Sequence, residues 1–318
     1  MLRWNTSNTA RTRITAILAV SAMAGSAFAQ SDSDASMGEA EIRAAVAAMA
    51  DDFLNGRPVR PFAPELSLEE AYRWQDEMVE MLRPTLGDLV GYKTGGHNPG
   101  PANPNFPAGG IRAQFLSGMF LDDGAAVRLE EMGADSFLEA DFAFRVGSAD
   151  INDAETDLEI LAGLDAVVPF AEIPDPTSEP DDNGMIRGVI GNMSTRIALA
   201  GEPVPIGATQ EWLDRLNNME YAVLDENGTL VQRASMADWY RPIEAVRWLR
   251  DHLQTYGKDL VPGHLLSLGN LGINRPFFDG TAMGDVYTGN RYHVEYYGLK
   301  DNGEPATVTI NVIRSADQ

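Results

Sequence analysis

The segment "SFLEADFAF", residues 136–144, places the carboxylates of Glu139 and Asp141 two positions apart in an otherwise apolar run. Alternate residues of a β-strand share a face, so a strand here presents both acids and Ala143 on one side. The opposite side carries Leu138, Ala140, Phe142 and Phe144. Two like charges on one face repel unless a cation separates them, and a divalent metal with oxygen ligands does this. A solvated strand face is the alternative, because exposed carboxylates are common.

A third acid, Glu172, lies in the apolar segment "AVVPFAEIPD" at residues 166–175. A carboxylate in such a run is expected to be buried, and a buried carboxylate is paired or coordinates a metal. Three acids on neighbouring strands predict a site for Mg²⁺ or Mn²⁺, with open positions for a chelating substrate. Zinc is disfavoured because no pattern of histidine or cysteine ligands accompanies the acids.

Lysine is rare in this chain and occurs only at positions 93, 258 and 300. Lys258 and Lys300 lie in polar turn sequences and are interpreted as surface residues. Lys93 lies in "LVGYKTGG", residues 89–96, between an apolar strand end and glycines. A lysine there is suited to hold a substrate carboxylate or to transfer a proton. A lysine that extends from a strand end into solvent is the alternative.

The pattern of apolar segments predicts a mixed α+β or barrel-like sheet. Short strand-like segments separated by Gly, Pro, Asn and Asp follow residue 88, and Asn227-Gly228 predicts a hairpin turn. Strands and helices do not alternate regularly, which argues against a doubly wound sheet. The segment 188–201 is predicted as a strand. Helices are predicted at 41–55, 67–84, 155–163, 209–217 and 241–256, with a Ser67–Glu70 capping box and Pro84 as the end of the second helix.

Charge and cysteine content exclude several classes of function. The formal net charge is −23, from 47 acidic and 24 basic residues. Nucleic acids and anionic membrane surfaces require a basic footprint, so neither is an expected partner. The chain has no cysteine, which excludes thiolate catalysis and disulfides.

The first 29 residues have the pattern of a secretory signal peptide. They contain three arginines and no acid, and continue into "ITAILAVSAMAGSAFA", residues 14–29. A basic start, a short apolar stretch and a final Ala-Phe-Ala predict cleavage after Ala29 and a periplasmic or secreted protein with no membrane segment. An uncleaved anchor is the alternative. We expect a mobile N-terminus and helical segment at 30–87, and a catalytic metal-binding domain at 88–318.

Seven short segments read, in chain order, LSLEEAYRWQ, LVGYKTG, FLEADFAF, VVPFAEI, GNMSTRIALAG, RPIEAVRWL and LVPGHLLSLGNLG. In content and order, over residues 66–298, they resemble the motifs of the 2-keto-4-pentenoate hydratase branch of the fumarylacetoacetate hydrolase superfamily. The corresponding positions include Gln75, Lys93, Glu139, Asp141, Glu172, Asn192, Gly201, Pro242, Ala245, Trp248 and Leu249. The resemblance implies the mixed-sheet, barrel-like fold of that superfamily, preceded by a small helical segment.

The same resemblance implies a metal held by Glu139, Asp141 and Glu172, with a 2-oxo acid chelating it through carboxylate and keto oxygens. The expected reaction is hydration of a 2-oxo-enoate, in which the metal stabilises an enolate and water adds at C4. Lys93 or a metal-ordered water would move the protons. On the same analogy, we expect a homo-oligomer.

Three further residues are candidates for the site. Tyr92 and Asn192, which lie in the matched motifs, are expected to contact substrate. His97 lies in the suspected lid, where the hydrolase branch activates water with a His-Glu pair. No glutamate follows His97 in that loop, which weakens the hydrolase interpretation.

The chain also departs from the hydratase pattern. Asp141 stands where the hydratases usually have glutamate, and Arg241 stands where they have histidine. The segment 95–114 matches poorly, and residues 266–272 lack the usual Thr-Gly-Ser. Two alternatives therefore stay open: C–C hydrolysis or decarboxylation of an acylpyruvate-like acid on the same metal site, and an exported binding protein that kept the fold without turnover.

Overall fold

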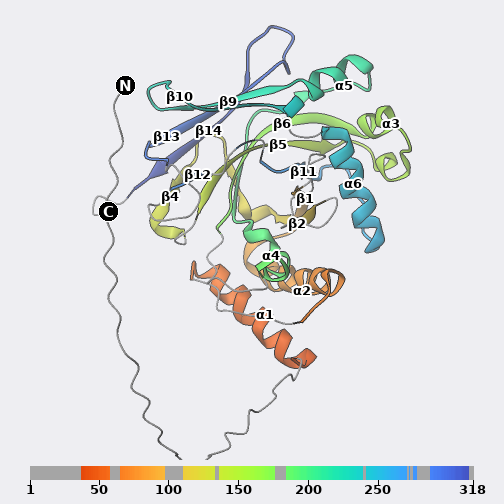
Figure 1. Cartoon of the computed structure of the whole chain (residues 1–318), viewed down its shortest axis with the longest axis vertical. Helices are drawn as coiled ribbons and strands as arrows, with labels where there is room; N and C mark the ends of the chain where they lie inside the picture. The colour runs from red at the N-terminus through yellow and green to blue at the C-terminus, as the bar shows by residue number, and fades with distance from the viewer. Residues whose placement is uncertain are drawn as a thin grey trace, which may run out of the picture. The chain divides into compact units, whose positions relative to one another are not determined.

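The strand that carries Glu139 and Asp141 is β5 (Phe137–Val146), and it lies inside a nine-stranded mixed sheet (Figure 1). The computed structural model describes residues 37–57, 65–96, 110–132, 136–175, 184–238, 241–270, 272, 275–277 and 287–314. The strand order is β2 (Ile111–Leu116), β1 (Leu89–Gly95), β11 (Leu265–Ser267), β5, β6 (Leu164–Ile173), β7 (Ile197–Ala200) and β3 (Phe120–Asp122). In addition, β12 (Arg275–Pro276) pairs with β5, and β8 (Val204–Pro205) pairs with β6.

A second sheet of five strands packs against one face of the first (Figure 1). Its order is β10 (Leu230–Ser235), β9 (Glu220–Asp225), β13 (Arg291–Tyr297), β14 (Ala306–Ile313) and β4 (Ala126–Arg128). The predicted hairpin at Asn227-Gly228 is confirmed, because it joins the antiparallel strands β9 and β10. The apolar face of β5 is buried in the core between the sheets, where the Tyr296 hydroxyl donates to the Phe170 carbonyl at 2.7 Å.

Helices cover the other face of the large sheet, which is the face that carries the acids (Figure 1). They are α1 (Glu39–Leu54), α2 (Leu68–Leu86) and α4 (Gly184–Ile190). The predicted capping box of α2 is confirmed: the Ser67 hydroxyl accepts from the Glu70 amide, and the Glu70 carboxylate accepts from the Ser67 amide. Apolar residues of the three helices form one core cluster with Phe115, Phe170 and Ala198 of the sheet. The helical segment therefore belongs to the same compact unit as the strands.

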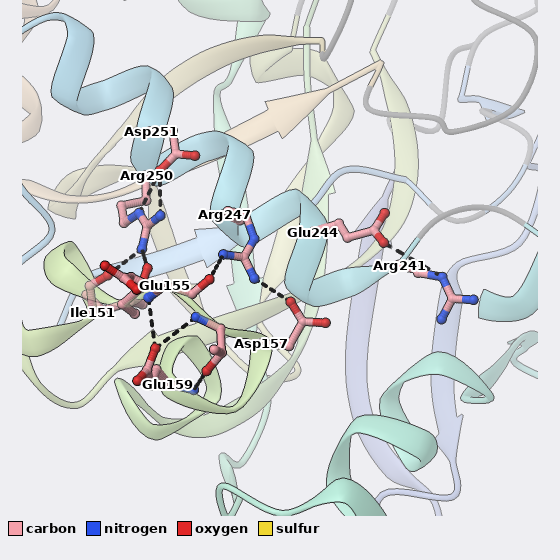
Figure 2. Close-up of polar contacts among 11 residues, drawn as sticks. Ile151, Glu155, Asp157, Glu159, Arg241, Glu244, Arg247, Arg250 and Asp251 are labelled. Atoms are coloured by element: carbon pink, nitrogen blue, oxygen red, sulfur yellow. Dashed lines mark hydrogen bonds and ion pairs between the residues drawn. The ribbon is translucent and has the colours of Figure 1, made fainter.

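Helix α6 (Pro242–Thr255) is tied to the segment around α3 (Asp157–Ala162) by arginines, as Figure 2 shows. Arg250 donates to the backbone carbonyls of Ile151 and Ala154, and Arg247 donates to the Glu155 carbonyl at 2.7 Å. Arg241, which stands where the hydratases have histidine, is the N-cap residue of α6, and its exposed side chain pairs with Glu244. The remaining helices are α5 (Gln210–Asn217) and 3₁₀ turns at Ser117–Met119, Leu129–Glu131, Ala149–Asp153, Asn192–Ser194 and Met236–Asp238.

All five predicted helices are present, each with both ends within about two residues of those expected. Two expectations about the chain's local structure are wrong. Pro84 does not end α2, which continues to Leu86 because Gly87 adopts a left-handed conformation (φ 82°) and caps the helix through a bond to the Arg83 carbonyl. The segment 188–201 is not one strand, because α4 and a turn occupy its first half and β7 begins only at Ile197.

The predicted signal peptide, residues 1–29, lies outside the described residues. Within the described part of the chain, no helix has the length and apolar character needed to cross a membrane.

Candidate metal centre

Glu139, Asp141 and Glu172 meet on the helix-covered face of the large sheet. Strands β5 and β6 are antiparallel, and their register places Glu139 directly opposite Glu172. Because side chains alternate along β5, Asp141 lies on the same face as Glu139, one pleat further along. One carboxylate oxygen from each of the three acids lies within 4.8 Å of the corresponding oxygens of the other two. All three residues are buried, and Asp141 and Glu172 have no exposed surface.

Lys93 extends from β1 into this cluster of acids. Its Nζ lies 2.5 Å from Glu172 Oε2 and 3.1 Å from Glu139 Oε2. Burial alone would lower the pKa of Lys93, but the attraction of Glu139, Glu172 and Asp141 outweighs burial and raises it above its ordinary value. The side chain is therefore a cation, and it is buried rather than directed into solvent.

One lysine does not neutralise three buried carboxylates. Burial raises the pKa of Glu172 to about 7, while Lys93 opposes the rise. Burial and the nearby Glu139 charge raise the pKa of Asp141 well above its ordinary value. Asp141 Oδ2 accepts from the Ser267 hydroxyl at 2.7 Å, but Asp141 Oδ1 and Glu172 Oε1 are buried without a hydrogen-bond partner.

These orphaned oxygens are what a hard divalent cation requires. Mg²⁺ and Mn²⁺ prefer oxygen ligands, and an all-carboxylate set on two strands leaves coordination positions for a bound acid. Leaving a carboxylate oxygen buried and unpaired costs about 1–3 kcal/mol or more, which a bound cation would offset. The residues present therefore fit such an ion, with Glu139, Asp141 and Glu172 as its ligands.

A cavity of about 360 Å³ opens onto the cluster at Lys93 and Glu139. Ser194 adds one further polar side chain to its lining. Its other walls are Ile111, Phe137, Pro174, Gly184, Met185, Gly188 and Met193. Of the three acids, Glu139 thus reaches a space whose lining is mostly apolar.

The turn that forms part of this wall has a left-handed backbone. Asn192, Met193 and Ser194 have φ values of 55°, 52° and 58°, a region that residues other than glycine rarely adopt. The Asn192 side chain holds the turn on β2, since Oδ1 accepts from the Gln114 amide at 2.7 Å and Nδ2 donates to the Gln114 carbonyl at 2.8 Å. Backbone strain of this kind gathers at functional sites.

The other predicted site residues are placed differently. Tyr92 precedes Lys93 on β1 and points to the opposite face, where its ring packs edge-on against His264 and burial raises its pKa to about 12. Asn192 lies beside the cavity, with its amide directed at Gln114 and not into the space. His97 lies outside the described residues.

Sequence reasoning missed two groups of residues at the site. Ser267, whose hydroxyl donates to Asp141, is the last residue of β11. The only indication of this role in the sequence is a hydroxyl residue at the end of an apolar strand. The wall residues Phe137, Met185 and Met193 carry no chemical signal in the sequence, because apolar residues are read as core.

Comparisons with known proteins bear on the fold. No family model matches the chain, and no curated protein matches it. Two solved structures of 4-oxalocrotonate decarboxylase from Pseudomonas putida G7 are similar, each at 20% identity over 87% of this chain and 99% of theirs. The complex with calcium and acetate has a TM-score of 0.67, and the complex with magnesium and adipate 0.68. The chain therefore has the fold of these decarboxylase structures, and that fold is α+β with mixed sheets, as predicted.

Proposed function

We propose that this chain is a divalent-metal-dependent enzyme that stabilises the enolate of a small 2-oxo acid. The observation that carries the proposal is the buried cluster of Glu139, Asp141 and Glu172 with Lys93 at the end of a cavity. The solved decarboxylase structures of the same fold hold calcium or magnesium, which supports a metal in this role. Within this proposal, Mg²⁺ or Mn²⁺ is the expected ion.

Each residue of the cluster has a distinct task. The three carboxylates would hold the metal, which when bound supplies a Lewis acid for the carboxylate and keto oxygens of the substrate. Lys93 supplies a fixed positive charge at the cavity end, suited to hold a substrate carboxylate or to donate a hydrogen bond to a developing oxyanion. The apolar walls lower the effective dielectric constant beside these groups, which strengthens both interactions.

Hydration of a 2-oxo-enoate is the first candidate reaction, and it rests on the sequence motifs around Lys93, Glu139 and Glu172. Water would add at C4 of the conjugated enone while the enolate is stabilised. Decarboxylation is the second candidate, favoured by the two decarboxylase structures. Decarboxylation also requires a site that stabilises the negative charge of an enolate. Hydrolysis of a C–C bond is the third, and its candidate water-activating residue, His97, lies outside the described residues.

Calorimetric titration of chelator-stripped mature protein with Mg²⁺ and Mn²⁺, with and without oxalate, tests the proposal. We expect metal binding that tightens in the presence of oxalate, a mimic of the chelating end of a 2-oxo acid. No binding at millimolar metal would contradict the proposal and leave the carboxylates as structure.

Turnover assays then separate the candidates. Loss of enone absorbance without release of carbon dioxide identifies a hydratase, and carbon dioxide release identifies a decarboxylase. A new pair of carbonyl products identifies a hydrolase. Metal and oxalate binding without turnover of any of these acids would identify the exported binding protein.

We also propose that the protein acts outside the cytoplasm after cleavage behind Ala29, and as a homo-oligomer. The sequence of residues 1–29 supports export, and analogy with the fold supports self-association. N-terminal sequencing of the periplasmic fraction tests the first proposal. Sedimentation of the mature protein tests the second.

A further inference from the structure

The cavity beside the acid cluster is lined mostly by apolar residues. Lys93, Glu139 and Ser194 supply its polar side chains, and Ile111 and Phe137 stand among its apolar walls. The remaining apolar side chains of the lining are Pro174, Met185 and Met193. Of the described residues that line the cavity, Lys93 alone carries a positive charge. A second carboxylate, far from the metal, would meet no cation among these residues and would lie against apolar side chains.

The cavity is also larger than a short acid requires. Its volume of about 360 Å³ corresponds to roughly twelve water-sized groups, at about 30 Å³ each. A five-carbon 2-oxo acid has only eight non-hydrogen atoms. The lining of the cavity includes two thioethers and an aromatic ring, which accommodate apolar groups of irregular shape.

We propose that the substrate is a 2-oxo monocarboxylic acid with a bulky apolar tail, such as an aryl or branched alkyl group, that fills the space between Phe137, Met185 and Met193. The inference rests on the proposed function, because the metal and Lys93 fix the acid end of the molecule. It excludes as preferred substrates both the small five-carbon acid and a dicarboxylic acid of similar length.

Larger side chains at the glycines of helix α4 would fill the cavity and so test where the tail lies. Gly184 and Gly188 line the cavity four residues apart, and a Cβ built at Gly188 would meet no atom within 4 Å. Neither glycine has a positive φ, so a larger side chain fits the helix backbone. Replacing a helical glycine also raises helix propensity, so these variants are expected to fold.

The first experiment measures binding of saturated 2-oxo acids to the Mg²⁺-loaded protein by calorimetry. The probes are pyruvate, 2-oxopentanoate, a phenyl-tailed 2-oxobutanoate and 2-oxoadipate. We expect affinity to rise by about fourfold for each buried methylene equivalent, and the phenyl-tailed acid to bind at least tenfold tighter than 2-oxoadipate. Equal affinities across the series, or tightest binding of 2-oxoadipate, would overturn the inference.

The second experiment repeats the series with Gly188→Ala, Gly188→Leu and Gly188→Phe. We expect the phenyl-tailed acid to lose affinity in that order, by more than tenfold in the largest variant, while Mg²⁺ affinity is kept. Unchanged binding of the phenyl-tailed acid to Gly188→Phe would overturn the placement of the tail.

The third experiment uses Met185→Arg, which adds the missing cation, with Leu158→Arg at an exposed position of α3 as the matched control. We expect 2-oxoadipate to gain affinity relative to the phenyl-tailed acid only in Met185→Arg. An equal change in both variants would contradict the placement of the apolar tail.

Oxalate distinguishes failure of this inference from failure of the proposed function. If oxalate tightens Mg²⁺ binding but tail length has no effect, the inference fails and the proposed function stands. If oxalate has no effect, the proposed function fails.

Discussion

Glu172 faces Glu139 across two central strands, and its side chain has no surface exposed to solvent. Lys93 binds Oε2, and Oε1 is buried without a hydrogen-bond partner, while burial raises the pKa of this carboxyl and the nearby Thr195 hydroxyl lowers it slightly. A buried carboxylate oxygen without a hydrogen-bond partner lowers stability, so a purely structural role does not explain Glu172. Replacing it by a neutral amide therefore distinguishes a metal ligand from a structural acid.

Glu172→Gln is expected to lower Mg²⁺ affinity by more than tenfold, which corresponds to about 1.4 kcal/mol or more of binding free energy. The amide keeps the shape and removes the charge, and calorimetry on the stripped protein measures the change. Glu80→Gln, at an exposed position on α2, is the matched control and should bind Mg²⁺ like the parent. An unaltered affinity in Glu172→Gln would mean that the acid is structural.

Lys93→Gln is expected to have opposite effects on metal binding and on turnover. The ammonium lies against the carboxylate oxygens that would coordinate the metal, so removing its charge should tighten Mg²⁺ binding by about tenfold. Turnover should fall, because the charge that holds the substrate carboxylate or oxyanion is lost. Lys300→Gln serves as the control. Weaker Mg²⁺ binding in Lys93→Gln would show instead that the lysine holds the acids in place for the metal.

Among the elements, the left-handed turn at Asn192–Ser194 joins α4 to β7 and carries two wall residues of the cavity. Its conformation depends on bonds to Gln114, which is 78 positions away in the chain. Asn192→Ala removes both bonds, and alanine adopts a positive φ less readily than asparagine does.

We expect Asn192→Ala to lower the free energy of unfolding by about 1–3 kcal/mol, from the loss of a buried hydrogen-bonded pair. Asn192→Gly loses the same bonds but tolerates φ of 55°, so it should be less affected. Urea denaturation of both variants measures the difference. If Asn192→Ala is as stable as the parent, the amide does not hold the turn.

The same elements show what could be read from the sequence. The face that carries Glu139 and Asp141 was predictable because the two-residue period of a strand fixes it locally. The turn was not, because its strained backbone is imposed by a partner distant in sequence. Tyr92 illustrates a different limit: a motif identified the strand, but the side chain next to Lys93 necessarily points the other way.

At the scale of the whole molecule, the buried charges link stability to pH. The folded-state pKa of Glu172 is about 7, above its ordinary value of 4.5. Between these values the folded metal-free protein retains a proton that the unfolded chain has released, so this group makes stability fall as pH rises. His252, whose pKa burial lowers to about 4, acts in the opposite direction up to about pH 6.5. Comparing the parent with Glu172→Gln removes the histidine contribution, since both proteins share it.

In chelator-stripped protein, the Tm of Glu172→Gln should rise relative to that of the parent between pH 5 and pH 8, because the amide has no proton to lose. Saturating Mg²⁺ should reverse the order at pH 8, since metal at a hundred times Kd stabilises the folded parent by about 2.7 kcal/mol. Thermal denaturation at each pH, with and without Mg²⁺, measures both differences. A constant difference across pH without metal would show that Glu172 has no raised pKa. A parent that gains nothing from Mg²⁺ at pH 8 would show that the cluster neutralises its charge through Lys93 and protons alone, without a metal.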